Sequence, residues 1–460
     1  MAALVLSLAG PARAEVTDAM RKAVDRVIAE KTATHLVPGI AVVVMEGEKV
    51  AYSFCRGPAG SGEITPETPF IVGSISKLFT ATAVMQLVDR GKIELEAPVQ
   101  RYLPDFRVVD ADASGRITVR QLLNQNSGLP TNAPRATGAD RTLQDHVKAL
   151  SGVSLAGPVG GGYTYSSPNY QVLGALVEKV SGSSFARYLE ENIFLPLGLR
   201  HSFTNLSQAR ANGLVPGRNL WFGWAGPSFY EFEPDRLPTA SIMTSAADIG
   251  RLLAAHLQNG RLGDVRLLSE SATQTMHRGV AEAGGFKYAM GLRAGPTAGL
   301  PSLWHGGALP NYRGAVVLLP QERRAVVVLT NMSTMLTDHT RDIAAAIVAA
   351  MQEQPRPVPA RSLRKSYLVI AVVALVLLLI QIRSLIRSWR RVQKAAVIPT
   401  LIFDLGIPIA ILFLVPRWLG VSLRAVIEGA PDLALFMALL MALSLATGMV
   451  KLWQRKGRSA

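Results

Sequence analysis

The sequence predicts an α+β fold in which an antiparallel sheet is formed by strands from both ends of a long first domain. A helical insertion separates these strands, and three transmembrane helices follow. Three observations predict this arrangement: β-rich runs near residues 40–57 and 314–331, helical sequence between them, and three long apolar stretches after residue 365. Strands at both ends of a domain with helices between them favour one antiparallel sheet over alternating βαβ units.

The chain begins with an apolar run. Residues 1–14, MAALVLSLAGPARA, end in an Ala-x-Ala pattern and predict a signal peptide, although no basic residue precedes the run. The alternative is an ordinary apolar N-terminus. An amphipathic helix is expected next, over residues 16–33, with Met20, Val24, Val27 and Ile28 on one side.

Two β-hairpins are expected in the first domain. In the first, Glu46-Gly47-Glu48 separates two β-rich runs, and the second lies within residues 314–331 and precedes a helical run at 340–352. The single cysteine, Cys55, cannot form an intrachain disulfide and is expected to be a buried small hydrophobic side chain. These elements assign the first domain to residues 15–353.

A Pro-rich linker at residues 354–365 leads to spans at 366–382, 397–415 and 431–450. Each span is close to the ~20 residues that the bilayer core requires. Residues 356–460 contain 15 Lys and Arg against 3 Asp and Glu, so they hold +12 of the formal net charge of +15, and the first 355 residues hold +3. The first domain lacks a basic stripe with interleaved aromatic residues, which excludes a nucleic-acid-binding class.

The basic residues also predict an orientation. The segment RSLIRSWRRVQK (383–394) and the C-terminal segment KLWQRKGRSA are both cytoplasmic if the first domain is exported, as the positive-inside rule requires. Asp404 lies inside the second span, where an ionisable group is costly. Its carboxylate is expected either to face a partner, such as an amphiphilic substrate, or to be tolerated near the interface.

The strongest local motif is GSISKLFTA. Ser74 and Lys77 stand three residues apart at the start of an apolar helix that Gly91 ends, so they share one face. A serine hydroxyl is a weak nucleophile until a base takes its proton, and a lysine can act as that base when burial or a neighbouring cation disfavours its ammonium form. The Ser-x-x-Lys pattern alone is short and also fits an ordinary helix start.

Three further segments follow this motif: ITVRQLLNQNSGLP (117–130), YSSPNYQVLGALVEKVSG (165–182) and LWHGGALPNYRG (303–314). In this order the four segments resemble the serine β-lactamase and penicillin-binding-protein superfamily, in its class C β-lactamase-like branch, which includes esterases, D-aminopeptidases and D,D-peptidases. The resemblance covers about residues 16–352. It implies a serine hydrolase that works through an acyl-enzyme and uses no cofactor or metal.

The resemblance also implies a role for individual residues. Ser74 matches the nucleophile, Lys77 its partner and Tyr165 the tyrosine that relays the proton to the leaving amine. The backbone N–H groups of Ser74 and Ala308 match the oxyanion hole. The strand beside the substrate is matched by His305, Gly306 and Gly307.

One position departs from the family pattern. Tyr165-Ser166-Ser167 replaces the usual Tyr-x-Asn, and with an exported domain and three spans it resembles membrane-anchored prodrug-activating peptidases of the colibactin-maturation type. Members of that group remove an N-acyl-D-asparagine cap on the periplasmic side of the bacterial inner membrane. The resemblance implies that Ser167 and Asn311 bind the D-residue.

Three other residues are weaker candidates for the same subsite. Asn169 could supply the amide that Ser167 lacks. The histidine that contacts D-asparagine in that group has no match here, and Asp235 or Arg236 stands in the corresponding region.

The predicted function is a membrane-anchored periplasmic serine peptidase or amidase that acts on acylated or D-amino-acid-containing peptides. A cell-wall D,D-peptidase and a broad esterase are the enzymatic alternatives. An inactive sensor that binds peptidoglycan is the alternative from another class. The sequence does not specify the physiological substrate or the oligomeric state.

Overall fold

The computed structural model describes residues 17–131 apart from 61, then 133, 136, 141–352, 362–390, six single positions between 402 and 414, and 422–456. The predicted signal peptide at 1–14 lies outside the described residues. So do most of the linker and most of the predicted span at 397–415.

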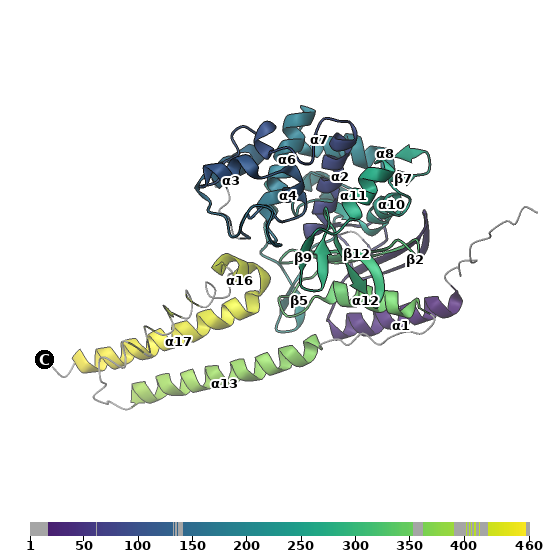
Figure 1. Ribbon diagram of the computed structural model, residues 1–460. Helices are drawn as coiled ribbons and strands as arrows, with labels where there is room; N and C mark the ends of the chain where they lie inside the picture. Colours follow the sequence, from purple (N-terminus) through teal and green to yellow (C-terminus); the bar gives the residue numbers. More distant parts are fainter. Residues whose placement is uncertain are drawn as a thin grey trace, which may run out of the picture.

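An eight-stranded antiparallel sheet lies at the centre of the first domain, in the order β2-β1-β14-β13-β12-β11-β10-β9 (Figure 1). The first strand pairs with the last, with Ile40 opposite Thr330, which confirms the predicted sheet built from both ends of the domain. The strands are β1 (Ile40–Glu46), β2 (Lys49–Arg56), β9 (Ala281–Ala283), β10 (Phe286–Tyr288), β11 (Arg293–Thr297), β12 (Leu300–Ala308), β13 (Arg313–Leu319) and β14 (Arg324–Thr330).

Both predicted hairpins are confirmed. Strand β1 ends at Glu46 and β2 begins at Lys49, and Gly47 between them has a φ of 58°, a left-handed conformation that glycine adopts without strain. The second hairpin joins β13 to β14. Cys55 lies in β2, as expected, and is partly buried where it packs against the core.

Helices cover both faces of the sheet, so its central strands are apolar on both sides. On β1, Val42 and Val44 pack into the cluster beneath α1 (Asp18–Thr34) and α12 (His339–Ala350). The alternate residue Val43 packs into the larger cluster with the helical insertion. Side chains of a strand alternate between its faces, which explains the uninterrupted run of Val residues. Both terminal helices were predicted from the sequence.

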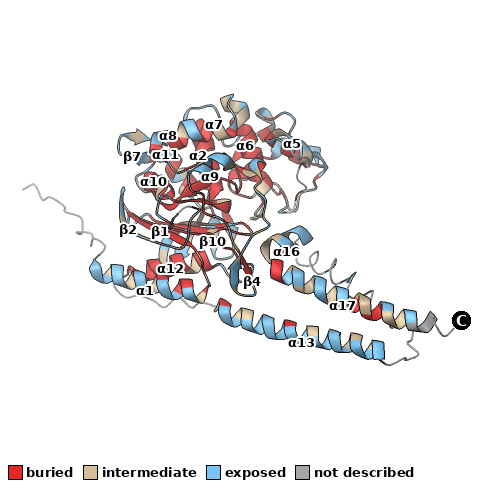
Figure 2. Cartoon of the chain, turned by 180° about the vertical axis from the view of Figure 1, so that it is seen from behind, coloured by how far each residue is buried: buried red, intermediate tan, exposed pale blue. Residues whose placement is uncertain are grey.

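The helical insertion lies on the face opposite α1 and α12, and its buried residues form one core with that face of the sheet (Figures 1 and 2). Its central helix, α2 (Ser76–Asp89), is buried along nearly its whole length. Short strand pairs flank the insertion: β3 (Pro69–Ile71) with β6 (Met243–Ser245), β4 (Asn219–Trp221) with β5 (Trp224–Gly226), and β7 (Arg261–Leu262) with β8 (Val265–Arg266). The other helices are α3 (Ala111–Arg116), α4 (Val119–Leu123), α5 (Leu143–Ala149), α6 (Ser167–Ser181), α7 (Phe185–Leu189), α8 (Leu195–Leu197), α9 (Leu206–Ala211), α10 (Ala246–Leu257) and α11 (Glu270–His277).

Two long helices extend side by side away from the first domain, α13 (Leu363–Arg390) and α17 (Pro431–Lys456) (Figure 1). Within the described residues, these two are long and apolar enough to cross a membrane, whereas three spans were predicted. The middle one falls largely on residues that the structure does not describe. Most of α13 is exposed (Figure 2), as expected of a helix that contacts lipid.

Helices α13 and α17 extend beyond the predicted first and last spans. Helix α13 begins three residues before 366, inside the predicted linker, and continues to Arg390, while α17 continues past 450. The extra residues are largely basic and polar, and such residues continue a helix beyond the apolar core without breaking it. Helix α16 (Leu423–Gly429) precedes α17 and lies between it and the first domain.

Asp404, one of the described positions of the middle segment, has a partner. Its Oδ2 accepts a hydrogen bond of 2.6 Å from the Lys451 ammonium on α17. Of the two alternatives for Asp404, the structure supports a partner, and this partner is a lysine of the same chain and not a substrate. Pairing with a cation lowers the cost of placing a carboxylate among apolar helices.

Candidate active site

Ser74 lies on a 3₁₀ turn, Gly73–Ile75, that leads directly into α2. The backbone before it is fixed because the Val72 N–H donates to the carbonyl oxygen of Ile242 at 3.0 Å. Ser74 is partly exposed although the residues on both sides of it are buried. The turn therefore presents the hydroxyl at the surface of a rigid core.

Lys77 is completely buried one turn further along. Its Nζ lies 3.1 Å from Ser74 Oγ and donates to the carbonyl oxygen of Thr239 at 2.9 Å. Burial lowers the pKa of Lys77 well below its usual 10.5, and the positive charges of Arg236 and Arg293 lower it further. The amine is therefore shifted toward the neutral form that can accept a proton.

Tyr165 completes the cluster from the other side. Its ring centroid lies 5.0 Å from Lys77 Nζ, and its phenol is close enough to the Ser74 hydroxyl for that group to lower the phenol pKa. Burial raises the pKa of the phenol, against the opposing effects of the Ser74 hydroxyl and of Arg293 and Arg236. The structure thus brings together the three predicted catalytic side chains, with the proton held on Tyr165 and disfavoured on Lys77.

Strand β12 lies against the turn that carries Ser74. A Cβ atom on Gly307 would lie 1.9 Å from the carbonyl oxygen of Val72, and one on Gly73 would lie 2.6 Å from the Ala308 nitrogen. Gly73 also has a φ of 56°. Glycine on both sides of this contact is what allows the strand and the turn to approach so closely.

The backbone N–H of Ala308 points away from β13. Leu309 N donates to the carbonyl oxygen of Tyr312, and antiparallel pairs alternate between bonded and non-bonded, so Ala308 opposite Arg313 is a non-bonded pair. On its other side β12 pairs with β11 only as far as Trp304. This leaves the Ala308 N–H on a free strand edge beside Ser74, as the predicted oxyanion hole requires.

The glycine contact gives a direct test. Gly307→Ala is expected to lower the rate of Ser74 acylation by about 10²-fold, because the strand must move by about an ångström and shift the Ala308 N–H. Gly306→Ala is the matched control, since the nearest atoms to its Cβ would be 3.8 Å away. Stopped-flow acylation by a chromogenic ester measures both variants, and equal losses would show that the close approach is not needed.

His305 is buried and its two ring nitrogens both have partners. Nδ1 donates to the carbonyl oxygen of Gly306 at 2.8 Å, and Nε2 lies 3.3 Å from the Tyr288 hydroxyl. Burial lowers the pKa of His305 well below its usual value of 6.5, so the ring is neutral and Nε2 accepts from Tyr288. The imidazole lies beside the Tyr165 ring, and this contact helps to hold the Tyr165 ring in place.

Ser167 is the first residue of α6 and is half-buried. In the part of the chain that the structure describes, its hydroxyl has no hydrogen-bond partner, so it is available to a ligand. The Asn169 amide is engaged within the chain: Nδ2 donates to Gln125 Oε1 at 2.6 Å and Oδ1 accepts from Ser127 Oγ at 2.6 Å.

Asn311 is buried and lies against the backbone of Gly217. Its side-chain oxygen has no partner among the described residues, but no contact there joins it to Ser167, so their joint role stays a prediction. Asp235 faces elsewhere, since its carboxylate accepts bonds from Arg141 and His146, both at 2.8 Å.

Four residues near the catalytic cluster were not predicted: Thr239, Tyr163, Tyr288 and Arg293. The Arg293 guanidinium lies 5.5 Å from the Tyr165 ring centroid, and its charge reaches Lys77, His305 and Tyr165. Its Nε is buried and has no hydrogen-bond partner among the described residues. Arg293 opens β11, which pairs with β12, and pairing these two runs as a hairpin would have placed it beside the site.

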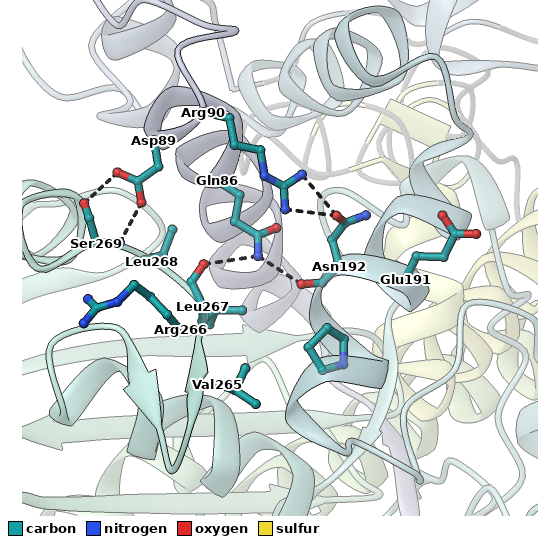
Figure 3. Close-up of a pocket in the computed structure, with 11 residues that line it drawn as sticks. Gln86, Asp89, Arg90, Glu191, Asn192, Val265, Arg266, Leu267, Leu268 and Ser269 are labelled. Atoms are coloured by element: carbon teal, nitrogen blue, oxygen red, sulfur yellow. Dashed lines mark hydrogen bonds between the residues drawn. The ribbon is translucent and has the colours of Figure 1, made fainter.

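A hollow of about 530 Å³ at the far end of α2 is not the active site (Figure 3). Three of its polar side chains bond to neighbouring lining residues: Gln86 to the backbone of Asn192 and Leu267, Arg90 to Asn192, and Asp89 to Ser269. None of the predicted catalytic residues lines it. The hollow lies at the packing interface between α2 and the segments around Asn192 and Leu267.

The beta-lactamase family model matches residues 24–351, which is most of the chain. The chain belongs to the beta-lactamase family. Among curated relatives of this family member, penicillin-binding protein 4 of Amycolatopsis lactamdurans is 29% identical, with 72% of this chain and 93% of that protein covered. Protein flp of Staphylococcus aureus strain MW2 is 24% identical, and the match covers 69% of this chain and 64% of flp.

A solved structure shares the fold of this beta-lactamase family member. The octameric penicillin-binding protein homologue from Pyrococcus abyssi superposes with a TM-score of 0.60 at 24% identity, over 72% of this chain and 77% of that one. At this identity the likeness establishes the fold. With the family match, the first domain is a serine β-lactamase-like hydrolase domain related to penicillin-binding proteins, as the sequence motifs predicted.

Proposed function

We propose that the protein is a serine peptidase or amidase that works through an acyl-enzyme on Ser74. The observation that supports this most directly is the buried Lys77 amine 3.1 Å from Ser74 Oγ, with the Tyr165 ring centroid 5.0 Å from the same amine. A dead sensor that only binds a ligand has no need of a desolvated lysine, which is costly to keep in a core.

The order of proton transfers follows from the lowered pKa of Lys77 and the raised pKa of Tyr165. Lys77 Nζ takes the proton from Ser74 Oγ while Oγ forms a bond to the substrate carbonyl carbon, and the carbonyl oxygen becomes an oxyanion. The N–H groups of Ser74 and Ala308 stabilise that charge. The proton then passes through the Tyr165 hydroxyl to the leaving amine as the C–N bond breaks, and water hydrolyses the resulting ester.

Arg293 supports the alternative of a D,D-peptidase. A guanidinium that lies close to Tyr165, with a buried Nε lacking a partner among the described residues, fits a carboxylate on the substrate. An acyl-D-alanyl-D-alanine peptide and its C-terminal amide distinguish the candidates. Preference for the free carboxylate supports the D,D-peptidase, and equal rates support the amidase.

Within the lead proposal, the substrate is an N-acyl-D-amino-acid amide such as the cap of a natural-product precursor. Ser167 supports this because its hydroxyl is half-buried and lacks a partner in the described structure. A polar pocket rejects ligands that leave its groups unpaired far more strongly than an apolar pocket rejects a ligand by size.

The substrate ranking provides a test of Ser167. Wild-type protein is expected to cleave an N-acyl-D-Asn amide faster than the D-Ala and L-Asn analogues, because the D-Asn amide bonds to Ser167. Ser167→Asn should abolish that preference and retain turnover of a simple ester. Steady-state kinetics on the three substrates measure the ranking, and an unchanged ranking in Ser167→Asn would remove Ser167 from specificity.

We also propose that the chain is anchored in the bacterial inner membrane by three helices, with the hydrolase domain on the periplasmic side. The support is the pair of long apolar helices α13 and α17, and the ion pair between Asp404 and Lys451 of α17. Basic residues cluster at the ends of the helices that lie away from the hydrolase domain, as the positive-inside rule expects of a cytoplasmic side.

A fusion experiment tests the number of spans. Three spans put the C-terminus in the cytoplasm, so green fluorescent protein fused there is expected to fluoresce and alkaline phosphatase to be inactive. Fusions after residue 352 serve as the matched control and should give the opposite pattern. An active phosphatase at the C-terminus would contradict three spans.

A further inference from the structure

A second hollow, of about 480 Å³, lies between the hydrolase domain and helix α16. The hydrolase domain supplies one wall and the residues around α16 supply the other. The first wall contains Ala136, Arg141, Tyr230, Glu233, Arg236 and Pro310, and the second contains Ser422, Arg424, Ala425 and Glu428. We call this hollow the α16 cleft.

The two walls of the α16 cleft are tied together by hydrogen bonds. Asn219, on β4, donates from Nδ2 to the carbonyl oxygens of Pro310 at 3.0 Å and Glu428 at 2.8 Å, one on each wall. The Phe222 N–H donates to Asp432 Oδ2 at 3.0 Å, next to the start of α17. These bonds hold α16 in a defined position against the hydrolase domain, so the fold itself sets the shape of the cleft.

Two chain segments connect the α16 cleft to the catalytic cluster. Arg236 lines the cleft, and its positive charge lowers the pKa of Lys77, so the two side chains are electrostatic neighbours. Three residues further along, Thr239 accepts the Lys77 hydrogen bond. On the other flank, Pro310 is two residues beyond Ala308. A substrate held at Ser74 and Ala308 therefore has the α16 cleft within reach of its distal part.

The chemistry of the walls indicates what the cleft binds. Its three arginines each have an acidic partner: Arg141 bonds to Asp235, Arg236 to Glu233, and Arg424 to Glu428 at 2.6 Å. Charges paired in this way leave no net charge to attract a single ion. They still offer many donors and acceptors close together, which suits a ligand rich in amide groups more than an alkyl chain or a lone carboxylate.

We propose that α16 is part of the substrate-binding site, and that the α16 cleft binds an amide-rich arm of the substrate extending from the scissile bond. The proposal rests on the proposed acyl-enzyme function. It assigns to the segment before α17 a role in specificity: Arg424 and Glu428 contact the peptide or acyl-amide arm, and substrates without such an arm do not use them.

Charge reversal on α16 tests the assignment. Arg424→Glu is expected to raise KM about tenfold for a substrate with several amide groups beyond the scissile bond, because a charge-assisted hydrogen bond is lost. Its kcat/KM for a short ester should equal the wild-type value, which also reports correct folding. Arg187→Glu is the matched control, since Arg187 also pairs with a Glu four residues on, at 2.7 Å, on the exposed surface of α7.

Failure of the α16 assignment and failure of the proposed function would give different results. Equal losses on the short ester and the long amide, or no loss on either, would overturn the role of α16 while leaving acyl-enzyme chemistry in place. Wild-type protein that cleaves neither substrate, and that no serine-directed probe labels, would overturn the proposed function and this inference with it.

A labelling experiment tests proximity without relying on turnover. Cys55 is the sole cysteine, so Arg424→Cys in a Cys55→Ala background carries one thiol. A phosphonate inhibitor with an amide-rich arm, bound to Ser74, is expected to slow maleimide labelling of that thiol at least about fivefold. A small phosphonate should leave the rate unchanged, as should either inhibitor for Arg187→Cys. Equal labelling with both inhibitors at Arg424→Cys would overturn the proposal.

Discussion

Replacing Ser74 with alanine is expected to abolish covalent labelling by a fluorescent phosphonate or penicillin probe and to remove hydrolysis of ester and amide substrates. The hydroxyl is the partly exposed group on the turn before α2, and it is the atom on which Lys77 and Tyr165 converge. Gel fluorescence after labelling, with intact-mass measurement of the adduct, detects the loss.

A control for this experiment is available on the surface. Ser207→Ala removes an exposed hydroxyl from α9 and is expected to label like the wild type. Labelling of Ser74→Ala at the wild-type level would exclude Ser74 as the nucleophile and with it the proposed mechanism.

Lys77→Met is expected to lower kcat/KM by about 10²- to 10⁴-fold, as loss of a general base does, which corresponds to about 3–5 kcal/mol of the activation barrier. Methionine keeps the apolar stem and most of the volume, so the core stays filled. Tyr165→Phe is expected to lower amide turnover in the same range by removing the relay to the leaving amine. Steady-state kinetics with an amide substrate measure both variants, and near-wild-type rates in both would refute the mechanism.

The pH dependence of kcat/KM also tests whether Lys77 acts as the base. Lys77 acts as a base only when neutral, so kcat/KM should fall as the pH drops through its pKa and level off above it. Because burial, Arg236 and Arg293 all lower that pKa, the acid limb should lie well below the usual pKa of a lysine. A pH profile with an uncharged ester locates the limb. A rate that still rises up to the ordinary lysine pKa would show that Lys77 is not desolvated in this way.

The fold could be predicted largely because its apolar patterns are strong. The Val runs of β1 and β14 and the Gly47 turn identified the sheet, and the Ser74–Lys77 spacing identified the start of α2. The short strand pairs could not be found in this way: β3 and β6 have three residues each, and Phe70 of β3 pairs with Thr244, more than 170 positions away. Such pairings depend on tertiary packing, and local sequence does not encode them.

The catalytic residues of the site were predicted from the sequence, but the residues that surround them were not. Ser74, Lys77 and Tyr165 stand in motifs, so their convergence was expected. Arg293 and Thr239 act through a charge and a backbone carbonyl, and neither needs a recognisable motif. Asp235 was a candidate by position, yet its carboxylate is paired with Arg141 and His146. Which side of a loop a side chain faces is decided by partners distant in sequence.

The hydrogen bonds from Asn219 to Glu428 and from Phe222 to Asp432 have a consequence for kinetics. They fix the hydrolase domain to α16 and to the start of α17, so that, with α13 and α17 in a bilayer as proposed, Ser74 is held at one height above the lipid headgroups. The active site then meets only those substrate molecules that lie in a thin layer next to the leaflet. For a substrate that partitions into lipid, turnover follows its mole fraction in the leaflet, and adding inert lipid slows the reaction at constant total substrate.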